Sequence, residues 1–413
     1  MNVDTFAVVT PVHLRTYANT RTRSLIAWLA ASTLVIYLIS SPLFLLKNFV
    51  FGDLWSAFAM FLVLFSRKAL KSLIRFFRSG YFFWSYLIST ATLVATFNAP
   101  DTLSNFKFIA QFWTTLWILT PLVAVGFSEM NSPMTFLEIC GWVYLTIYAM
   151  GSVLLFSFGI NWIIGDTGIG RFWPQSINFG AFPLTTLCLS VTYLCTTKKL
   201  KLRYLVMLLS VAAIEILKAS RTGYVVIIVV IIIASASALR SWRGFLSLLI
   251  AGGATGMLLF STFLNDMLGI RLVTTHFFED DIRLNSINTA WQTIRQDGTA
   301  LLLGVGWGNS GAGGQVVHNV PFQTLTEAGI LTALGLLGLL ALPLMWIVRS
   351  KYSNSVERTF AFLLYGGLWV MWMFEPIPAE RTNWLPFVVL MGMANRLRVD
   401  HRRNSPSNLQ CSN

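Results

Sequence analysis

About a dozen long apolar runs, separated by short polar loops, constrain what this chain can fold into. Hydrophobic residues make up 55% of the 413 residues, charged residues only 11%, and the mean hydropathy is +0.66. A soluble protein of this size needs more charge to cover its surface. Because a transmembrane helix needs roughly 20 apolar residues, the sequence predicts an all-α, polytopic membrane protein.

The apolar runs predict about twelve membrane spans in one transmembrane domain, 25–395. It lies between a cytoplasmic N-terminal segment, 1–24, and a cytoplasmic tail, 396–413, expected to be disordered. No convincing cleavage site follows the first run, so we expect it to be a retained span. The largest loop, about 265–319, separates spans nine and ten. The expected spans are 25–46, 54–66, 81–97, 108–127, 135–160, 177–196, 204–217, 224–239, 245–264, 320–348, 360–374 and 384–394.

Basic residues indicate how the chain is oriented. Most of the 30 lysines and arginines fall in the two termini and in alternate loops. Basic loops stay in the cytoplasm, so both termini are expected there. The net charge of +13 could suggest a nucleic-acid partner. Because the cations lie in short loops between apolar runs, we interpret the charge as a membrane-orientation signal and expect no nucleic acid.

Motifs for metals, disulfides and nucleotides are weak. Cys140, Cys188 and Cys195 lie in apolar runs and no C-x-x-C pair occurs, so neither a disulfide nor a metal site is predicted. The glycine run 304–314 superficially suggests a phosphate-binding loop. No strand precedes it, however, and no βαβ unit fits around it, so a flexible or close-packed loop is favoured.

Several cations break the positive-inside trend, because the expected topology puts them on the extracytoplasmic side. A guanidinium binds anions in a bidentate manner and stays charged, which suits it to a diphosphate. The plainer alternative is contact with lipid headgroups. Arg221 is the strongest candidate, since it lies between two apolar spans, where an unpaired charge is costly. The set comprises Arg171, Lys218, Arg221, Arg271, Arg283, Arg295, His318 and Arg381.

His318 is the candidate general base, because an imidazole titrates near neutral pH. It stands at the end of the longest polar stretch, immediately before the apolar run 320–348. Its plainer alternative is a hydrogen-bonded surface histidine. His276 has no comparable setting.

Short motifs resemble those of a known family. His318-Asn319, nine residues, Gly329, two residues and Thr332 match the H-[NSQ]-x9-G-x-x-[GTY] pattern of O-antigen ligases. The superfamily also includes Wzy-type O-antigen and exopolysaccharide polymerases. The glycine run that begins at Leu303, the Ser220-Arg221-x-Gly223 turn and the loop containing Arg171 look like its other signatures. Arg283 resembles the arginine that begins the family's large periplasmic loop.

This resemblance implies a metal-independent, cofactor-free, inverting glycosyltransferase of the bacterial inner membrane with a GT-C-like fold and a periplasmic site. The donor would be a glycan on undecaprenyl diphosphate. The acceptor would be lipid A–core in a ligase, which is slightly favoured, or a second lipid-linked glycan in a polymerase. His318 and Arg221 would be catalytic. The diphosphate would be held by Arg171, Arg221, Arg283 and Lys218, with support from Asn319, Glu327, Gly329 and Arg381.

A transporter of lipid-linked oligosaccharide is the alternative from another class. It would show charges deep inside several spans, or an internal repeat. Glu138, Glu215 and Glu327 are the only acidic residues inside the expected spans, and no repeat is visible. Glycosyl transfer is therefore favoured.

Overall fold

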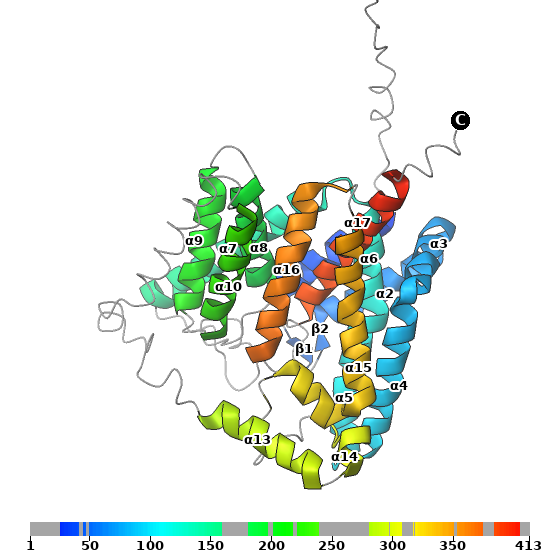
Figure 1. The fold of residues 1–413 in the computed structure, drawn as a ribbon. Coiled ribbons are helices and arrows are strands. Elements are labelled where there is room, and N and C mark those ends of the chain that lie inside the picture. The colour runs from blue at the N-terminus through cyan, green and yellow to red at the C-terminus, as the bar shows by residue number, and fades with distance from the viewer. Residues whose placement is uncertain are drawn as a thin grey trace, which may run out of the picture.

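The fold is known from a computed structural model, which describes residues 25–40, 44–46, 49–158, 181–196, 201–217, 221–238, 281–296, 298–307, 317, 319–350, 353–374 and 384–404. Helices account for nearly all of these residues (Figure 1). Two short strands, β1 (Phe44–Leu46) and β2 (Phe49–Val50), form an antiparallel pair. The prediction of a helical protein is confirmed.

The helices follow the apolar runs. Every expected span except 245–264, which lies outside the described residues, coincides with helical structure. The helices are α1 (Leu25–Ser40), α2 (Phe51–Leu64), α3 (Arg67–Phe76), η2 (Phe77–Tyr81), α4 (Phe82–Phe97), α5 (Thr102–Trp113), η3 (Thr114–Leu119), α6 (Thr120–Glu129), α7 (Pro133–Phe158), α8 (Ala181–Thr196), α9 (Leu202–Leu217), α10 (Arg221–Ala238), α13 (Asp281–Gln296), α14 (Gly298–Leu303), α15 (Val320–Arg349), α16 (Ser355–Phe374) and α17 (Leu385–Asn404).

Two helical stretches in the described part of the chain, Ile109–Glu129 and Val320–Arg349, are long and apolar enough to cross a membrane. Shorter apolar helices cover Leu25–Leu38, Phe51–Leu64, Phe182–Thr196 and Thr222–Ala234. Length and composition therefore support membrane spans at two of the expected positions, 108–127 and 320–348.

The chain departs from the expected boundaries in two basic segments. The basic stretch after span two was expected to be a loop, but it forms α3, which Ser66 caps by accepting a hydrogen bond from the Ala69 N–H. The chain after the last span continues as helix α17 to Asn404. There Arg398 lies 4.4 Å from the Trp346 ring centroid and donates to Asn395. Burial lowers the Arg398 pKa to about 10, which leaves it charged at neutral pH.

The first span also ends earlier than expected. Helix α1 stops at Ser40, and β1 begins four residues later. Pro42 accounts for this end, because a proline disfavours helical geometry at the residue before it and cannot donate a backbone hydrogen bond.

Helices α6 and α17 form the centre of the bundle. Every residue from Thr120 to Ser128 is buried, and so is every residue from Leu385 to Asn395. Helix α17 packs on α6, α8, α15 and α16, while α15 packs on α4 and α10 packs on α16. Burial on all sides explains why these two segments read as continuous apolar runs.

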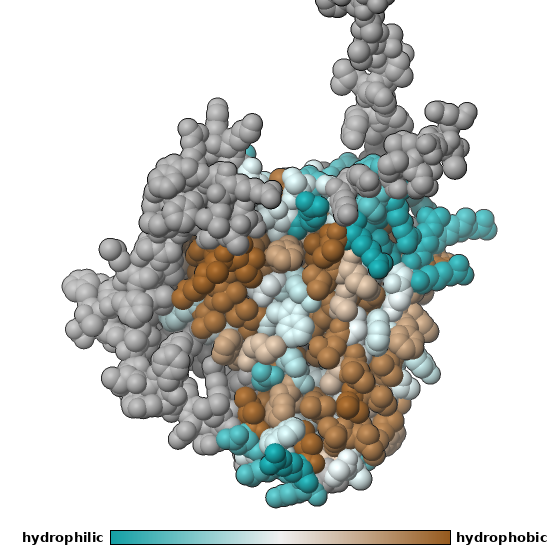
Figure 2. Space-filling view, in the orientation of Figure 1, coloured by the Kyte–Doolittle hydropathy of each residue, from teal (hydrophilic) through white to brown (hydrophobic). Residues whose placement is uncertain are grey.

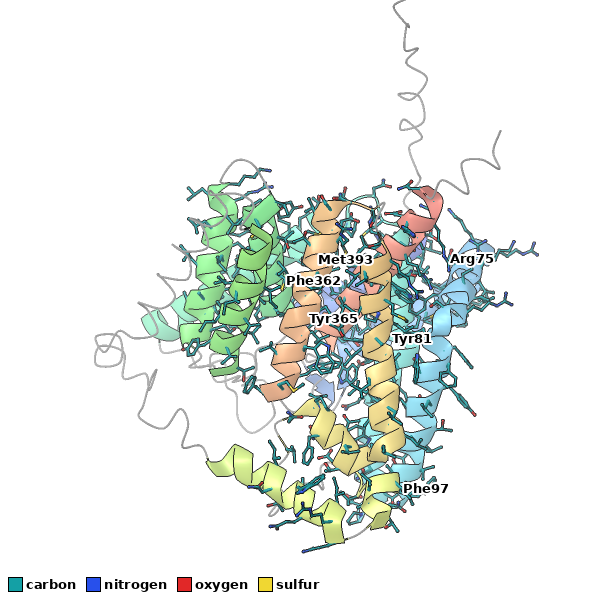
Figure 3. The ribbon with its side chains drawn as sticks, viewed as in Figure 1. Arg75, Tyr81, Phe97, Phe362, Tyr365 and Met393 are labelled. Carbon is teal, nitrogen blue, oxygen red and sulfur yellow. The ribbon has the colours of Figure 1, made fainter. Side chains whose placement is uncertain are left out.

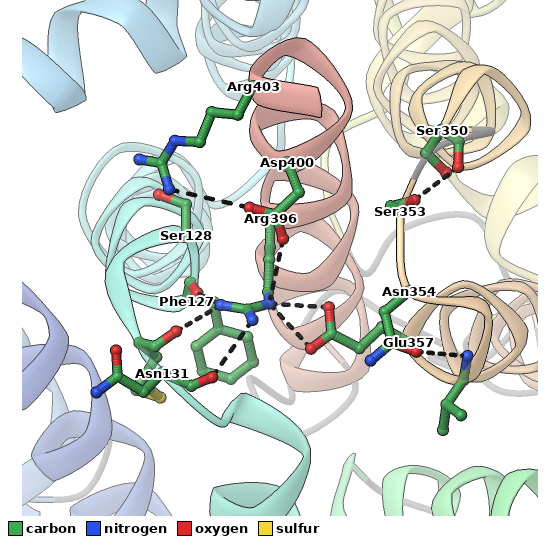
Figure 4. Close-up of polar contacts among 12 residues, drawn as sticks. Phe127, Ser128, Asn131, Ser350, Ser353, Asn354, Glu357, Arg396, Asp400 and Arg403 are labelled. Carbon is green, nitrogen blue, oxygen red and sulfur yellow. Dashed lines mark hydrogen bonds and ion pairs between the residues drawn. The ribbon is translucent and has the colours of Figure 1, made fainter. Parts of the chain in front are cut away.

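Arg396 joins α17 to its neighbours (Figure 4). Its Nε donates to both carboxylate oxygens of Glu357 in α16, at 3.0 and 2.8 Å. Its terminal nitrogens donate to three carbonyl groups at the end of α6, those of Phe127, Met130 and Asn131. The last carbonyls of a helix lack intrahelical donors, so one guanidinium satisfies the end of α6 and neutralises a buried carboxylate.

On the face seen in Figure 2, the described residues are mostly apolar along the middle of the bundle and polar at its two ends. Exposed apolar side chains on α2, α4, α15 and α16 form this apolar belt: Phe58, Phe61, Phe82, Phe83, Leu331, Leu334, Leu337 and Phe362. Arg75 lies at one end of the belt and Phe97 at the other (Figure 3). A bundle with apolar sides suits a bilayer, where only satisfied backbone can face lipid.

Candidate functional site

Helix α15 is broken inside its apolar sequence. The backbone of Gly329 has φ 80° and ψ 171°, which no helical residue adopts and which is essentially restricted to glycine. The break divides α15 into a short segment, Val320–Ala328, and a long one from Ile330 to Arg349. Breaks of this kind occur at membrane depth only where the freed backbone groups find other partners.

The glycine-rich segment after α14 supplies those partners. The backbone N–H of Val305 donates to the Thr326 carbonyl at 3.0 Å, and that of Gly306 donates to the Glu327 carbonyl at 2.9 Å. These two carbonyls would otherwise accept from residues of the next helical turn. The segment Gly304–Trp307 thus docks on α15 at the point where its helix is interrupted.

The docking brings two backbones closer than any side chain allows. A Cβ at Gly304, whose φ is 77°, would overlap the Glu327 carbonyl oxygen and lie 2.6 Å from the Ala328 nitrogen. A Cβ at Gly329 would overlap the Leu302 carbonyl oxygen. Glycine is therefore required on both sides of the contact.

Asn105 of α5 holds the far end of this segment. Its Oδ1 accepts a 2.6 Å hydrogen bond from the Trp307 backbone N–H, and its Nδ2 donates to the Asp101 carbonyl. Asn105 is buried. With Gly304 N–H bonded to the Ala300 carbonyl, all four N–H groups of Gly304–Trp307 are engaged within the protein. The segment is close-packed and its amides do not form a phosphate cradle.

We predict that Asn105→Ala destabilises this docking, because the buried Trp307 N–H loses its acceptor. The free energy of unfolding should fall by about 1–3 kcal/mol, measured by denaturant titration of the purified protein in detergent. Asn98→Ala is the matched control, since Asn98 is exposed at the end of α4. Equal stability of the two variants would show that Asn105 does not anchor the segment.

A buried carboxylate lies at the break. Glu327 has no exposed surface, and its Oε1 accepts a 3.0 Å hydrogen bond from Gln323 Nε2, one turn earlier in α15. On the other side of Gly329, the Thr332 hydroxyl donates to the Ala328 carbonyl at 2.7 Å. Polar groups at this depth are costly unless they are hydrogen-bonded, so they mark the break as a specialised site.

Asn319 begins α15 beside the end of α16. Its Oδ1 accepts a 3.0 Å hydrogen bond from the Phe322 N–H, which caps the helix. Its Nδ2 lies 3.4 Å from the Met373 carbonyl oxygen. The spacing Asn319-x9-Gly329-x2-Thr332 therefore has a structural meaning, since its positions are the helix cap, the break and the hydroxyl that bonds across the break.

Helix α13 lies at the same end of the bundle (Figure 1). Ala290 and Ile294 are buried, while Trp291 is 42% exposed. The Trp291 ring lies 6.2 Å from that of Phe322 in α15, and the Arg295 guanidinium carbon lies 5.2 Å from the Trp291 ring centroid. The expected loop 265–319 thus contains helices, and α13 places an aromatic ring and a cation beside the start of α15.

A second buried carboxylate, Glu215, lies near the end of α9. It is close enough to Tyr144 of α7 and Tyr224 of α10 to interact electrostatically with their hydroxyls. Arg221 is the first residue of α10, four residues after α9 ends. Arg221 therefore begins the helix that follows α9, whose last turn carries a buried acidic side chain.

The structure places only some of the candidate residues. Asn319, Glu327 and Gly329 lie on the same short segment of α15, from its cap to its break. Arg221 lies at the start of α10 and Arg283 lies in α13, but their side chains are outside the described part. Five candidates lie outside it altogether: Arg171, Lys218, Arg271, His318 and Arg381.

Sequence patterns did not reveal Asn105 and Gln323 as parts of this site. Asn105 falls between the expected spans 81–97 and 108–127, and the structure places it in α5. Gln323 is the residue one helical turn before Glu327, which was the available signal. Among the residues that the structure describes, no group of three or more His, Cys, Asp or Glu side chains could hold a metal ion.

Comparisons with known proteins give no assignment. No model of a known protein family matches the chain, and a search of curated proteins finds no match. A function must therefore be inferred from the residues and their arrangement.

Proposed function

We propose that this protein is a polytopic inner-membrane glycosyltransferase with about twelve spans and a GT-C-like fold, related to O-antigen ligases and polymerases. The observation that carries the proposal is the agreement between motif and geometry at α15. In the ligase-like pattern, Asn319 caps helix α15, Gly329 breaks it, and the Thr332 hydroxyl hydrogen-bonds across the break. All three residues lie within an apolar bundle. Such a break places hydrogen-bonded polar groups inside an apolar bundle, next to the start of α15, where we propose that a lipid-borne substrate arrives.

In the proposed reaction, the donor is a glycan on undecaprenyl diphosphate and the site is periplasmic. The acceptor hydroxyl attacks the anomeric carbon, a new carbon–oxygen bond forms, and the bond to the diphosphate breaks with inversion. His318 takes the proton from the hydroxyl. Arg171, Arg221, Arg283 and Lys218 bind the diphosphate and stabilise its charge as it leaves. Arg381 supports this set.

The described residues support a role for the docked segment in positioning. His318 directly precedes Asn319, whose side chain caps α15 and contacts the end of α16. The N–H groups of Val305 and Gly306 bond to the break from the other side, and Asn105 accepts from the Trp307 N–H at the end of the same segment. A base must stand within hydrogen-bonding reach of the proton it takes, so a rigid start of α15 favours catalysis at position 318.

The acceptor decides between ligase and polymerase. The pattern that begins at His318 favours the ligase, which transfers glycan to lipid A–core. The test is deletion in the host, followed by gel analysis of surface glycans. Loss of all long glycan from lipid A–core, with lipid-linked polymer accumulating, would identify a ligase. A core with one repeat, or loss of a free polysaccharide alone, would identify a polymerase. Unchanged glycans would contradict both.

We predict that His318→Ala lowers glycan transfer by a factor of about 10²–10⁴, because the reaction loses its general base. His276→Ala is the matched control and should transfer at the normal rate. The measurement is transfer to acceptor in membranes that contain equal amounts of each variant. Normal transfer by His318→Ala would show that the proposed base is wrong.

One observation favours a second candidate, a transporter of lipid-linked oligosaccharide. Broken helices with polar groups at the break are typical of transporters, and α15 combines such a break with the buried Glu327. Proteoliposomes distinguish the two functions. Movement of a lipid-linked glycan across the bilayer without formation of a glycosidic bond would support transport, whereas product formation would support the transferase.

A further inference from the structure

Helix α3 has one buried face and one basic face. Ala69, Leu73 and Phe76 are buried against the bundle, where α3 packs on α2 and α6. The other face and the start of η2 expose five cations: Arg67, Lys68, Lys71, Arg75 and Arg78. We call these five residues the α3 basic face.

The α3 basic face has no carboxylate partners in the part of the chain that the structure describes. Among the described residues, the basic partners of the ion pairs are Arg203, Arg396 and Arg403. Glu129, at the end of the neighbouring α6, instead accepts a 3.0 Å hydrogen bond from the Ser72 hydroxyl. Five like charges on little more than three turns repel one another, so an external anion would stabilise this surface.

The α3 basic face borders the apolar belt. Phe65, immediately before α3, is 73% exposed, Leu64 is 52% exposed and Ile74 within α3 is 42% exposed. The backbone leaves helical geometry at Gly80, so α3 is kinked relative to α4. Figure 2 shows polar side chains gathered at this end above the apolar belt, and Figure 3 shows Arg75 at the same end.

We propose that α3 binds the phosphate groups of anionic phospholipids and anchors this end of the bundle at the membrane surface. Cations that border exposed apolar side chains match a headgroup layer, which offers negative charge beside acyl chains. A nucleic acid or an acidic protein would match the charge but not Phe65 and Ile74. The proposal requires a membrane location and is independent of the glycosyl-transfer chemistry.

Two double variants test the proposal on the full-length protein. Lys71→Gln/Arg75→Gln removes two cations of α3 that have no carboxylate partner among the described residues. Arg402→Gln/Arg403→Gln removes two cations at the end of α17, where Arg403 already pairs with Asp400 at 3.9 Å. Binding of phosphatidylglycerol and of phosphatidylcholine is measured on the detergent-purified protein by native mass spectrometry. Denaturant titration checks that both variants are folded.

The expected result is preferential binding of phosphatidylglycerol, weakened by a factor of about 30 in the α3 variant and nearly unchanged in the α17 variant. Equal binding of the two lipids would overturn the proposal. So would an equal loss in both variants, because this would show a response to net charge alone. Full competition by inorganic phosphate would also overturn it, by revealing an anion site that does not require lipid.

Discussion

Replacing Gly329 with alanine is expected to lower the free energy of unfolding by about 3 kcal/mol or more and to abolish function. The residue has φ 80° and ψ 171°, a region in which a Cβ costs of order 1–3 kcal/mol by itself. The new Cβ would also overlap the Leu302 carbonyl oxygen and lie 2.8 Å from its carbonyl carbon. Both partners are backbone, so no rotamer change relieves the overlap, and the docked segment must separate from α15.

Gly298→Ala is the matched control for this variant. Gly298 lies at the start of α14, and a Cβ there would meet nothing within 4 Å. It should leave stability unchanged or raise it by up to about 1 kcal/mol, because alanine loses less conformational entropy in a helix. Denaturant titration in detergent and glycan transfer in membranes are measured in parallel. A Gly329→Ala variant as stable as Gly298→Ala would refute the description of the break.

Replacing Arg396 with alanine is expected to cost about 3–5 kcal/mol of stability, because it leaves a charge buried without its partner. The Glu357 side chain is 7% exposed and Arg396 itself is 14% exposed. The carbonyl groups of Phe127, Met130 and Asn131 lose the hydrogen bonds from Arg396 in the same step. Since Arg396 joins α17 to α6 and α16, the change loosens the centre of the bundle (Figure 4).

Arg403→Ala provides the control. Arg403 is 50% exposed and contacts Asp400 at 3.9 Å, and exposed ion pairs of this kind contribute about 1 kcal/mol or less. Arg396→Lys should be intermediate, because an ammonium keeps the charge but cannot match the planar donor geometry of guanidinium. Adding Glu357→Gln to Arg396→Ala should recover part of the stability, since it removes the unpaired charge. A loss no greater than that of Arg403→Ala would contradict the proposed role.

The predicted spans agree with the helices because helix formation in an apolar segment depends mainly on the residues of that segment. An apolar run of sufficient length must form a helix in a bilayer, since no water is present to bond its backbone. The expected span 320–348 corresponds to α15 at Val320–Arg349, and the expected span 135–160 to α7 at Pro133–Phe158. The predicted helix boundaries were wrong where the residues that decide them pack against helices distant in sequence. The basic stretch 67–76 forms a helix because its three buried apolar residues pack on α2 and α6.

The candidate site was predictable in composition but not in geometry. The polar residues around 318–332 and the glycine run before them stood out from an apolar chain. Their arrangement depends on Asn105, which accepts from Trp307 across 202 positions of sequence. No pattern of neighbouring residues encodes that pair. A phosphate cradle and a docking segment can share the same glycine spacing, and they differ only in where the N–H groups point.

The sequence by itself determined that this chain is helical and apolar enough to occupy a membrane, because hydropathy and backbone satisfaction are properties of each segment alone. It also marked the segment in which α15 begins. Only the tertiary structure decided that Gly329 breaks that helix, that Gly304–Trp307 bonds to the break, and that Arg396 closes the end of α6. These features depend on contacts between segments that are distant in sequence. Packing of the helices brings the hydrogen-bond partners together and buries them, and burial sets how much each hydrogen bond contributes to stability.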